Sequence, residues 1–318
     1  MYKRNVTTVV LLGFHTMEKF NLWIFTILLI TSFVAICGNL LIIFLVSISK
    51  TLHSPMYFFL TQLSLADIVL TTNISPNMLS VVLHKGVSIS FPSCIAQLYF
   101  FGLSEISECL ILTVMSYDRY LAICSPLHYA SIMSHVLCVK LVLASWLLSS
   151  LVALILTLGV CQLQFCGPNT VDHFFCDLNP LLDLSCSDAS IIKLELTLLC
   201  VPVLVLPFFV VVVSYVCIVV TVMQISSISG LQKSMSTCSS HLTVVCLFYG
   251  TIFVMYVIPN KGKSQETSKT IAMLYTVFTP FLNPFIYSLR NKDIKEALRK
   301  TAHKCITLQN NKKAFPLS

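Results

Sequence analysis

Long stretches without a charged side chain are the feature that most limits how this chain can fold. Asp, Glu, Lys and Arg are all absent from five stretches: 20–49, 141–171, 196–232, 234–260 and 270–289. Each is long enough for the roughly 20 residues that an α-helix needs to cross the hydrocarbon core of a bilayer. Charged residues form 10% of the chain, whereas soluble domains usually carry about 25%. The composition therefore argues against a water-soluble enzyme.

Two further apolar stretches contain acidic residues, with Asp67 inside one and Glu105 and Glu108 inside the other. They bring the predicted spans to seven, so the two chain ends lie on opposite sides of the membrane. We predict an all-α membrane protein, a seven-transmembrane helix bundle with a short amphipathic eighth helix. The predicted parts are an extracellular N-terminus at 1–21, the bundle at 22–289 and a cytoplasmic tail at 290–318.

The orientation follows from three cues. Basic residues accumulate in the tail after Arg290, as expected for a cytoplasmic segment. Asn5 opens an Asn-Val-Thr glycosylation sequon, which is modified only on the lumenal side. The region 161–190 is rich in cysteines and acids, which suits an oxidising compartment. The net charge of +7 is too dispersed for a nucleic-acid surface, so no nucleic-acid partner is expected.

Four cysteines fall in regions predicted to lie on the lumenal side of the membrane, and they can form two disulfides in three possible pairings. These four are Cys94, Cys166, Cys176 and Cys186. A bridge from Cys94 to the later loop would hold that loop over the mouth of the bundle as a lid. His173, Cys176 and Asp177 also resemble a metal-ligand set, but a bridged cysteine has no thiolate to offer a metal. No metal or cofactor is expected.

Polar side chains inside the predicted spans are candidate functional residues, because they are costly to place in hydrocarbon. They are Asn39, Asp67, Glu105, Glu108, His241 and Asn283. Glu105 and Glu108 are three residues apart and share a helix face. Asp67, Asn39 and Asn283 are expected to form a buried polar cluster, whose role can be either signalling or helix assembly.

Prolines interrupt several spans and are expected to kink their helices. They are Pro76, Pro202, Pro207, Pro280 and Pro284. A kinked bundle that can repack between two states fits a receptor or a transporter. A transporter usually shows internal repeats, and none is visible here. No nucleophile–base pair or phosphate-binding glycine loop favours an enzyme.

Ordered motifs along nearly the whole chain identify a family. They are Gly38-Asn39, LHSPMYFFL at 52–60, LSLAD at 63–67, MSYDRYLAIC at 115–124, SPLHY at 125–129, Ser214-Tyr215, KSMSTCSSHL at 233–242 and PFLNPFIYSLRN at 280–291. Together they resemble the odorant receptors of the rhodopsin-like G-protein-coupled class. Phe248-Tyr249-Gly250 replaces the Trp and Pro motif of most rhodopsin-like receptors, which separates this chain from a non-olfactory receptor.

The resemblance implies a function and a set of partners. A small volatile odorant is expected to bind in the outer half of the bundle and to activate a stimulatory G protein that raises cAMP. The expected location is the plasma membrane of sensory cilia. The resemblance also implies disulfides Cys94–Cys176 and Cys166–Cys186, and it places Glu108 beside Asp67 and Asn39 in the buried polar cluster.

Arg119 is the predicted centre of the switch at the cytoplasmic end. Its guanidinium stays charged and can exchange partners, so we expect it to pair with Asp118 at rest and to regroup with Tyr215 and Tyr287 on activation. The predicted switch set is Asp118, Arg119, Tyr120, Tyr215, Asn283, Pro284 and Tyr287.

Helical spacing outward from Arg119 predicts a mainly apolar ligand pocket. The predicted lining is Phe101, Gly102, Glu105, Ile106, Val203, Leu204, Tyr249, Ile252, Phe253, Tyr256, Met273 and Thr276. Glu105 is the sharpest individual candidate. Its charged form would favour an amine ligand and its protonated form would donate to an alcohol or a carbonyl, and a purely structural hydrogen bond is the alternative.

Overall fold

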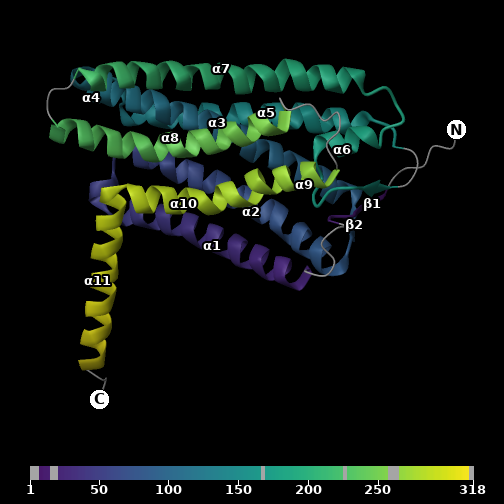
Figure 1. Cartoon of the computed structure of the whole chain (residues 1–318), viewed down its shortest axis with the longest axis horizontal. Helices are drawn as coiled ribbons and strands as arrows, with labels where there is room; N and C mark the ends of the chain where they lie inside the picture. Colours follow the sequence, from purple (N-terminus) through teal and green to yellow (C-terminus); the bar gives the residue numbers. More distant parts are fainter. Residues whose placement is uncertain (1–6, 15–20, 166–168, 225–227, 257–264, 315–318) are drawn as a thin grey trace.

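The bundle consists of long helices that run side by side along the longest axis of the molecule (Figure 1). The structure is a computed structural model that describes residues 7–14, 21–165, 169–224, 228–256 and 265–314. Within these ranges, seven helical rods form the bundle, and the last rod has three consecutive parts. They are α1 (Asn21–Ile48), α2 (Pro55–His84), α3 (Phe91–Cys124), α5 (His135–Gln162), α7 (Ser190–Met223), α8 (Ile228–Tyr256) and α9–η3–α10 (Gln265–Met273, Leu274–Phe278 and Thr279–Arg290).

Five of the described helices are long and apolar enough to cross a membrane: α1, α2, α3, α5 and α7. A sixth apolar stretch, Cys238–Phe253, lies within α8. The seventh rod contains the π-helical turn η3 directly before Pro280, so no single regular helix spans its whole length. Short helices connect the rods at η2 (Lys50–Leu52), α4 (Pro126–Ile132) and α6 (Leu178–Asp183).

Local sequence signals set several helix ends. Ser90 caps α3 by accepting a hydrogen bond from the Ser93 backbone NH, and Ser134 caps α5 in the same way. Lys85 ends α2 in the left-handed conformation, and Gly86 follows it with a φ of 136°, which favours glycine.

A small three-stranded sheet covers one end of the bundle, and the sequence did not predict it. β1 (Thr8–Leu11) is the central strand; it pairs antiparallel with β2 (Val87–Ser90) and parallel with β3 (Thr170–Val171). Val9 and Leu11 are buried, so their alternate side chains pack on the bundle. The N-terminal segment is therefore part of the covering layer.

The tail forms α11 (Lys292–Ala314), which leaves the opposite end of the molecule and runs steeply across the bundle axis (Figure 1). Ile294 and Ala297, on the apolar face of this amphipathic helix, are buried in the core of the bundle. Leu298 is exposed, as are the basic residues Lys292, Lys295, Arg299 and Lys300. The first turns of α11 therefore dock on the protein with one face and leave a basic surface on the other.

Candidate functional site: a lidded cavity and the predicted switch residues

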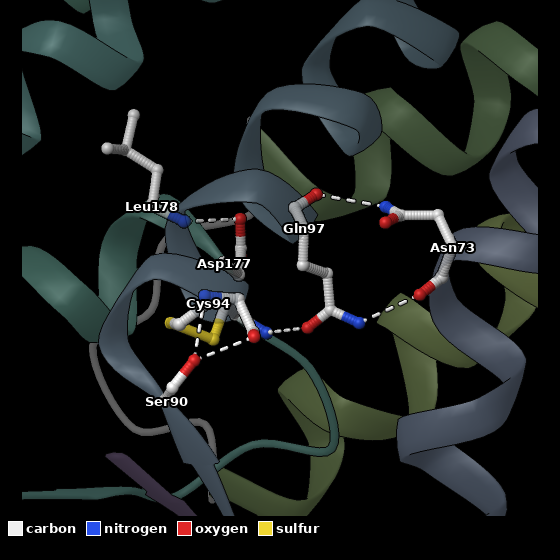
Figure 2. Close-up of a disulfide and its surroundings, with 8 residues drawn as sticks. Asn73, Ser90, Cys94, Gln97, Asp177 and Leu178 are labelled. Atoms are coloured by element: carbon white, nitrogen blue, oxygen red, sulfur yellow. Dashed lines mark hydrogen bonds between the residues drawn. A yellow bond between two sulfur atoms is a disulfide. The ribbon is translucent and has the colours of Figure 1, made fainter. Parts of the chain in front are cut away.

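A disulfide joins the outer end of α3 to the loop that follows α5. Cys94 and Cys176 are bonded and both are fully buried. Beside them, the Gln97 side chain accepts a hydrogen bond from the Cys176 backbone NH at 2.9 Å. Gln97 and Asn73 also exchange two side-chain-to-backbone hydrogen bonds of 2.9 Å (Figure 2), so Asn73 ties α2 to α3. The predicted pairing of Cys94 with Cys176 is present, and the loop forms the lid.

Two other predictions on this side involve residues that the structure does not describe. Cys186 is disulfide-bonded, while its expected partner Cys166 lies outside the described residues. Asn5, the predicted glycosylation site, also lies outside them. Both assignments stay predictions.

A buried lysine fixes the lid to the seventh rod. Lys269 on α9 is fully buried, and its ammonium bonds to Asp172 of the lid at 2.5 Å and to the Gly13 carbonyl at 2.6 Å. One cation therefore joins α9, the lid and the N-terminal segment. His173 packs against the rings of Phe174 and Phe175. Burial and the charge of Lys269 lower the pKa of His173 to about 3, so the imidazole is neutral.

Under the lid lies a cavity of about 1120 Å³ between α3, α5, α7 and α8. Most of its walls are aliphatic or aromatic side chains. Glu105 on α3 and Asp177 of the lid are its two ionisable carboxyl groups among the described lining residues. Burial raises the pKa of Asp177 to about 6, although its hydrogen bond from the Leu178 backbone NH opposes this (Figure 2).

Nine of the twelve predicted pocket residues line this cavity: Phe101, Gly102, Glu105, Ile106, Val203, Leu204, Tyr249, Ile252 and Phe253. Met273 and Thr276 are not among the lining residues, and the Thr276 hydroxyl instead bonds the Ala272 carbonyl at 2.9 Å. The side chain of Tyr256 lies outside the described residues.

The cavity also has walls that spacing from Arg119 did not predict. Asp177 and Leu178 enter from the lid, and Tyr275 enters from η3. The position of Asp177 directly after Cys176 is the sequence signal that could have revealed it. The cavity also extends as far as Val220 on α7 and Leu242 on α8, deeper than the outer half.

Tyr249 lies where the cavity meets the packed interior. Its hydroxyl is 3.2 Å from the Cys109 thiol, which also donates to the Val203 carbonyl at 3.5 Å. That carbonyl is available because Pro207, four residues later in α7, has no NH to bond it. The thiol therefore links α3 to the kink of α7 and to α8.

Asn39 likewise bonds a carbonyl that a proline leaves without its helical donor, here in the last rod. Pro284 leaves the Pro280 carbonyl without its helical donor, and the Asn39 side chain donates to it at 3.2 Å. Asn283 next to Pro284 donates to Asp67 at 3.0 and 3.2 Å and to Glu108 at 3.4 Å. The structure thus brings the predicted polar cluster together.

At the end of the bundle away from the lid, Arg119 pairs with the neighbouring Asp118 through two of its nitrogens. Tyr129 of α4 donates a third hydrogen bond to Asp118, to its other oxygen Oδ1, at 2.8 Å. Burial and the charge of Asp118 raise the pKa of Tyr129, so its hydroxyl stays a donor. Tyr120 packs instead against Tyr117, with ring centroids 6.4 Å apart.

Among the described residues, Tyr215 and Tyr287 make no hydrogen bond to Arg119. The Tyr215 hydroxyl is 2.6 Å from His241 Nδ1, and His241 Nε2 is 3.1 Å from the Leu112 carbonyl. His241 must donate from Nε2, so Nδ1 accepts from Tyr215. The buried Tyr287 hydroxyl has no partner among the described residues. From the sequence, His241 was a polar candidate but was not included in the predicted switch. Its hydrogen bond to Tyr215 connects it to that set.

Comparison with known proteins agrees with this geometry. The family model described as olfactory receptor matches residues 27–304. Olfactory receptor 11L1 of Homo sapiens is 46% identical and covers 97% of this chain and 96% of its own length. Olfactory receptor 1M1 of Mus musculus is 44% identical over 94% of this chain and 95% of its own.

A solved structure supports the fold independently. Squid rhodopsin superposes with a TM-score of 0.72 at 20% identity, covering 92% of this chain and 87% of its own. A likeness at that identity concerns the fold alone. From the family match, the close relatives and the lidded seven-helix bundle, we conclude that this chain belongs to the olfactory receptor family and is an odorant receptor with the rhodopsin-like fold.

Proposed function

We propose that a small, mainly apolar volatile odorant binds in the cavity under the lid and activates a stimulatory G protein that raises cAMP. The proposal places the N-terminus outside the cell, α11 on the cytoplasmic face and the protein in the plasma membrane of sensory cilia. The basic surface of α11 supports this orientation, because such a surface is attracted to anionic headgroups.

One observation carries the coupling proposal: α8 contacts both functional regions. Tyr249 lines the cavity, and His241, two helical turns away on α8, bonds Tyr215. A ligand that binds better when α8 is displaced shifts the bundle toward that state by its differential affinity. Loss of the Tyr215–His241 bond would free Tyr215, and Arg119 could then leave Asp118 to meet Tyr215 and Tyr287. A G-protein helix would enter the cleft that opens.

The test is Arg119→Ala, measured as odorant-evoked cAMP in cells, with surface expression measured in parallel. We expect at least a tenfold loss of response, because the substitution removes the only side chain of the motif that can exchange charged partners. Arg299→Ala on the exposed face of α11 is the matched control and should respond normally. An undiminished response of Arg119→Ala at normal surface level would refute the coupling role.

A further inference from the structure

The cavity holds two carboxyl groups and no cation. Glu105 and Asp177 line it, while Lys, Arg and His are absent from its described lining. Resting on the odorant-binding function proposed above, we infer that this receptor recognises amines: an ammonium group lies between Glu105 and Asp177, and a hydrocarbon body fills the apolar remainder.

Glu105 is the first reason. No hydrogen bond or ion pair joins its carboxyl group to another described residue, although Glu108, one turn away on the same face, is bonded by Asn283. The carboxyl oxygens of Glu105 are therefore open to the cavity. An unpartnered carboxylate in apolar surroundings is costly, and a cationic ligand offsets that cost.

Asp177 is the second reason, and it lines the same cavity from the lid. Only one of its oxygens, Oδ1, caps α6 by accepting from Leu178 at 2.7 Å. Its Oδ2 has no hydrogen-bond partner among the described residues, and Asp177 lines the cavity. Since its pKa is about 6, the group is mainly ionised at neutral pH. A carboxylate on the lid and one on α3 can hold an ammonium group from two sides.

The cations Lys269 and Arg119 are already paired. Lys269 bonds Asp172 and the Gly13 carbonyl, and Arg119 bonds Asp118. Neither is a lining residue. Glu105 and Asp177 repel one another when both are ionised, and an ammonium group between them would remove that repulsion.

The remaining walls define the rest of the ligand. Phe101, Ile106, Leu204 and Ile252 present hydrocarbon surface to the same space. A volatile aliphatic or alicyclic amine combines a single cation with such a body. A neutral alcohol or carbonyl compound of equal length makes the same apolar contacts with the walls, but it brings no positive charge to the two carboxyl groups.

The experiment compares hexylamine, octylamine and cyclohexylamine with 1-hexanol, 1-octanol and cyclohexanol. Each compound is tested for cAMP response in cells and for a rise in melting temperature of the purified receptor. We expect the amines to act at about tenfold lower concentration than their matched alcohols, because a charge-assisted hydrogen bond replaces a neutral one. Glu105→Gln should remove most of this preference, Asp177→Asn should reduce it, and Glu105→Asp should retain part of it.

Matched controls lie outside the cavity. Glu195→Gln on α7 and Asp183→Asn at the exposed end of α6 remove the same charges without touching its walls, so both should keep the amine preference. If alcohols stabilise or activate the receptor and amines do neither, the amine inference fails while the odorant-receptor function stands. If amines raise the melting temperature without any cAMP response, the inference stands and the proposed coupling fails. Inactivity of both compound sets in both assays would overturn both.

Discussion

The adjacent residues Gly38 and Asn39 both act at the position of Pro284 on another helix. A Cβ added to Gly38 would lie 2.9 Å from Cβ of Pro284, so the absence of a side chain lets α1 approach the kink. Asn39 then reaches the Pro280 carbonyl that Pro284 leaves unbonded. The close approach and the hydrogen bond depend on each other, because the amide reaches that carbonyl only while the two helices are in contact.

Gly38→Ala is therefore expected to lower the melting temperature of the purified receptor, because either the Pro284 ring or one of the two helices must move to make room for the new methyl group. Overpacking of this kind costs typically about 1–3 kcal/mol. Gly250→Ala is the control: a Cβ there meets nothing within 4 Å, and replacing a helical glycine by alanine stabilises by about 0.5–1 kcal/mol. Equal melting temperatures for the two variants would contradict the packing argument.

In the lid, two titrating groups change the stability of the lid in opposite directions as the pH falls. The pKa of His173 is lowered to about 3 from an ordinary value of about 6.5, so its contribution to lid stability is lost as pH falls below about 6.5. The pKa of Asp177 is raised to about 6 from about 3.9, so its contribution is present at low pH and is lost as pH rises through about 4 to 6. Charged neighbours of His173 are Lys269 and Asp172.

Single variants should separate the two effects. On acidification from pH 7 to 5, Asp177→Asn should lose hydrogen-exchange protection in the lid, because only His173 still titrates. His173→Phe should gain protection over the same range, because only Asp177 remains. The wild-type lid should change less than either variant. Parallel pH profiles for all three proteins, after correction for intrinsic exchange, would contradict this account.

At the scale of the elements, features that depend on neighbouring residues in the sequence were predictable, and features that depend on distant contacts were not. The seven rods follow from apolar stretches, and the Cys94–Cys176 bridge follows from the family motifs. The cavity side of α3 follows from helical periodicity, which places Phe101, Gly102 and Glu105 on one face. The depth of the cavity along α7 and the entry of Asp177 depend on how kinked helices and a bridged loop settle against each other, and no local pattern in the sequence encodes that.

The sheet was missed for a similar physical reason. β1 has only four residues and β3 only two, and their hydrogen bonds join segments that are distant in the sequence. Strands this short carry almost no periodic signal. The docking of Ile294 and Ala297 on the bundle was also missed, because an amphipathic pattern shows that a face is apolar without showing whether protein or lipid covers it.

At the scale of the whole molecule, β1 closes the outer end of the bundle by joining two loops. Leu11→Asp should reduce surface expression strongly, because it places a carboxylate at a fully buried position. Val10→Asp on the alternate, partly exposed face is the control and should be tolerated far better. The measurement is antibody labelling of intact cells against total receptor. Equal surface levels for the two variants would show that β1 is not seated on the bundle.

The central position of β1 has a consequence for biosynthesis. Residues 8–11 leave the ribosome first, but the strands they join, 87–90 and 170–171, are synthesised after two and four membrane helices respectively. The segment 8–11 therefore stays unpaired, with Val9 and Leu11 uncovered, until the fourth helix and the loop after it have been made. The sheet that covers this end of the bundle is thus completed only after most of the bundle has been synthesised.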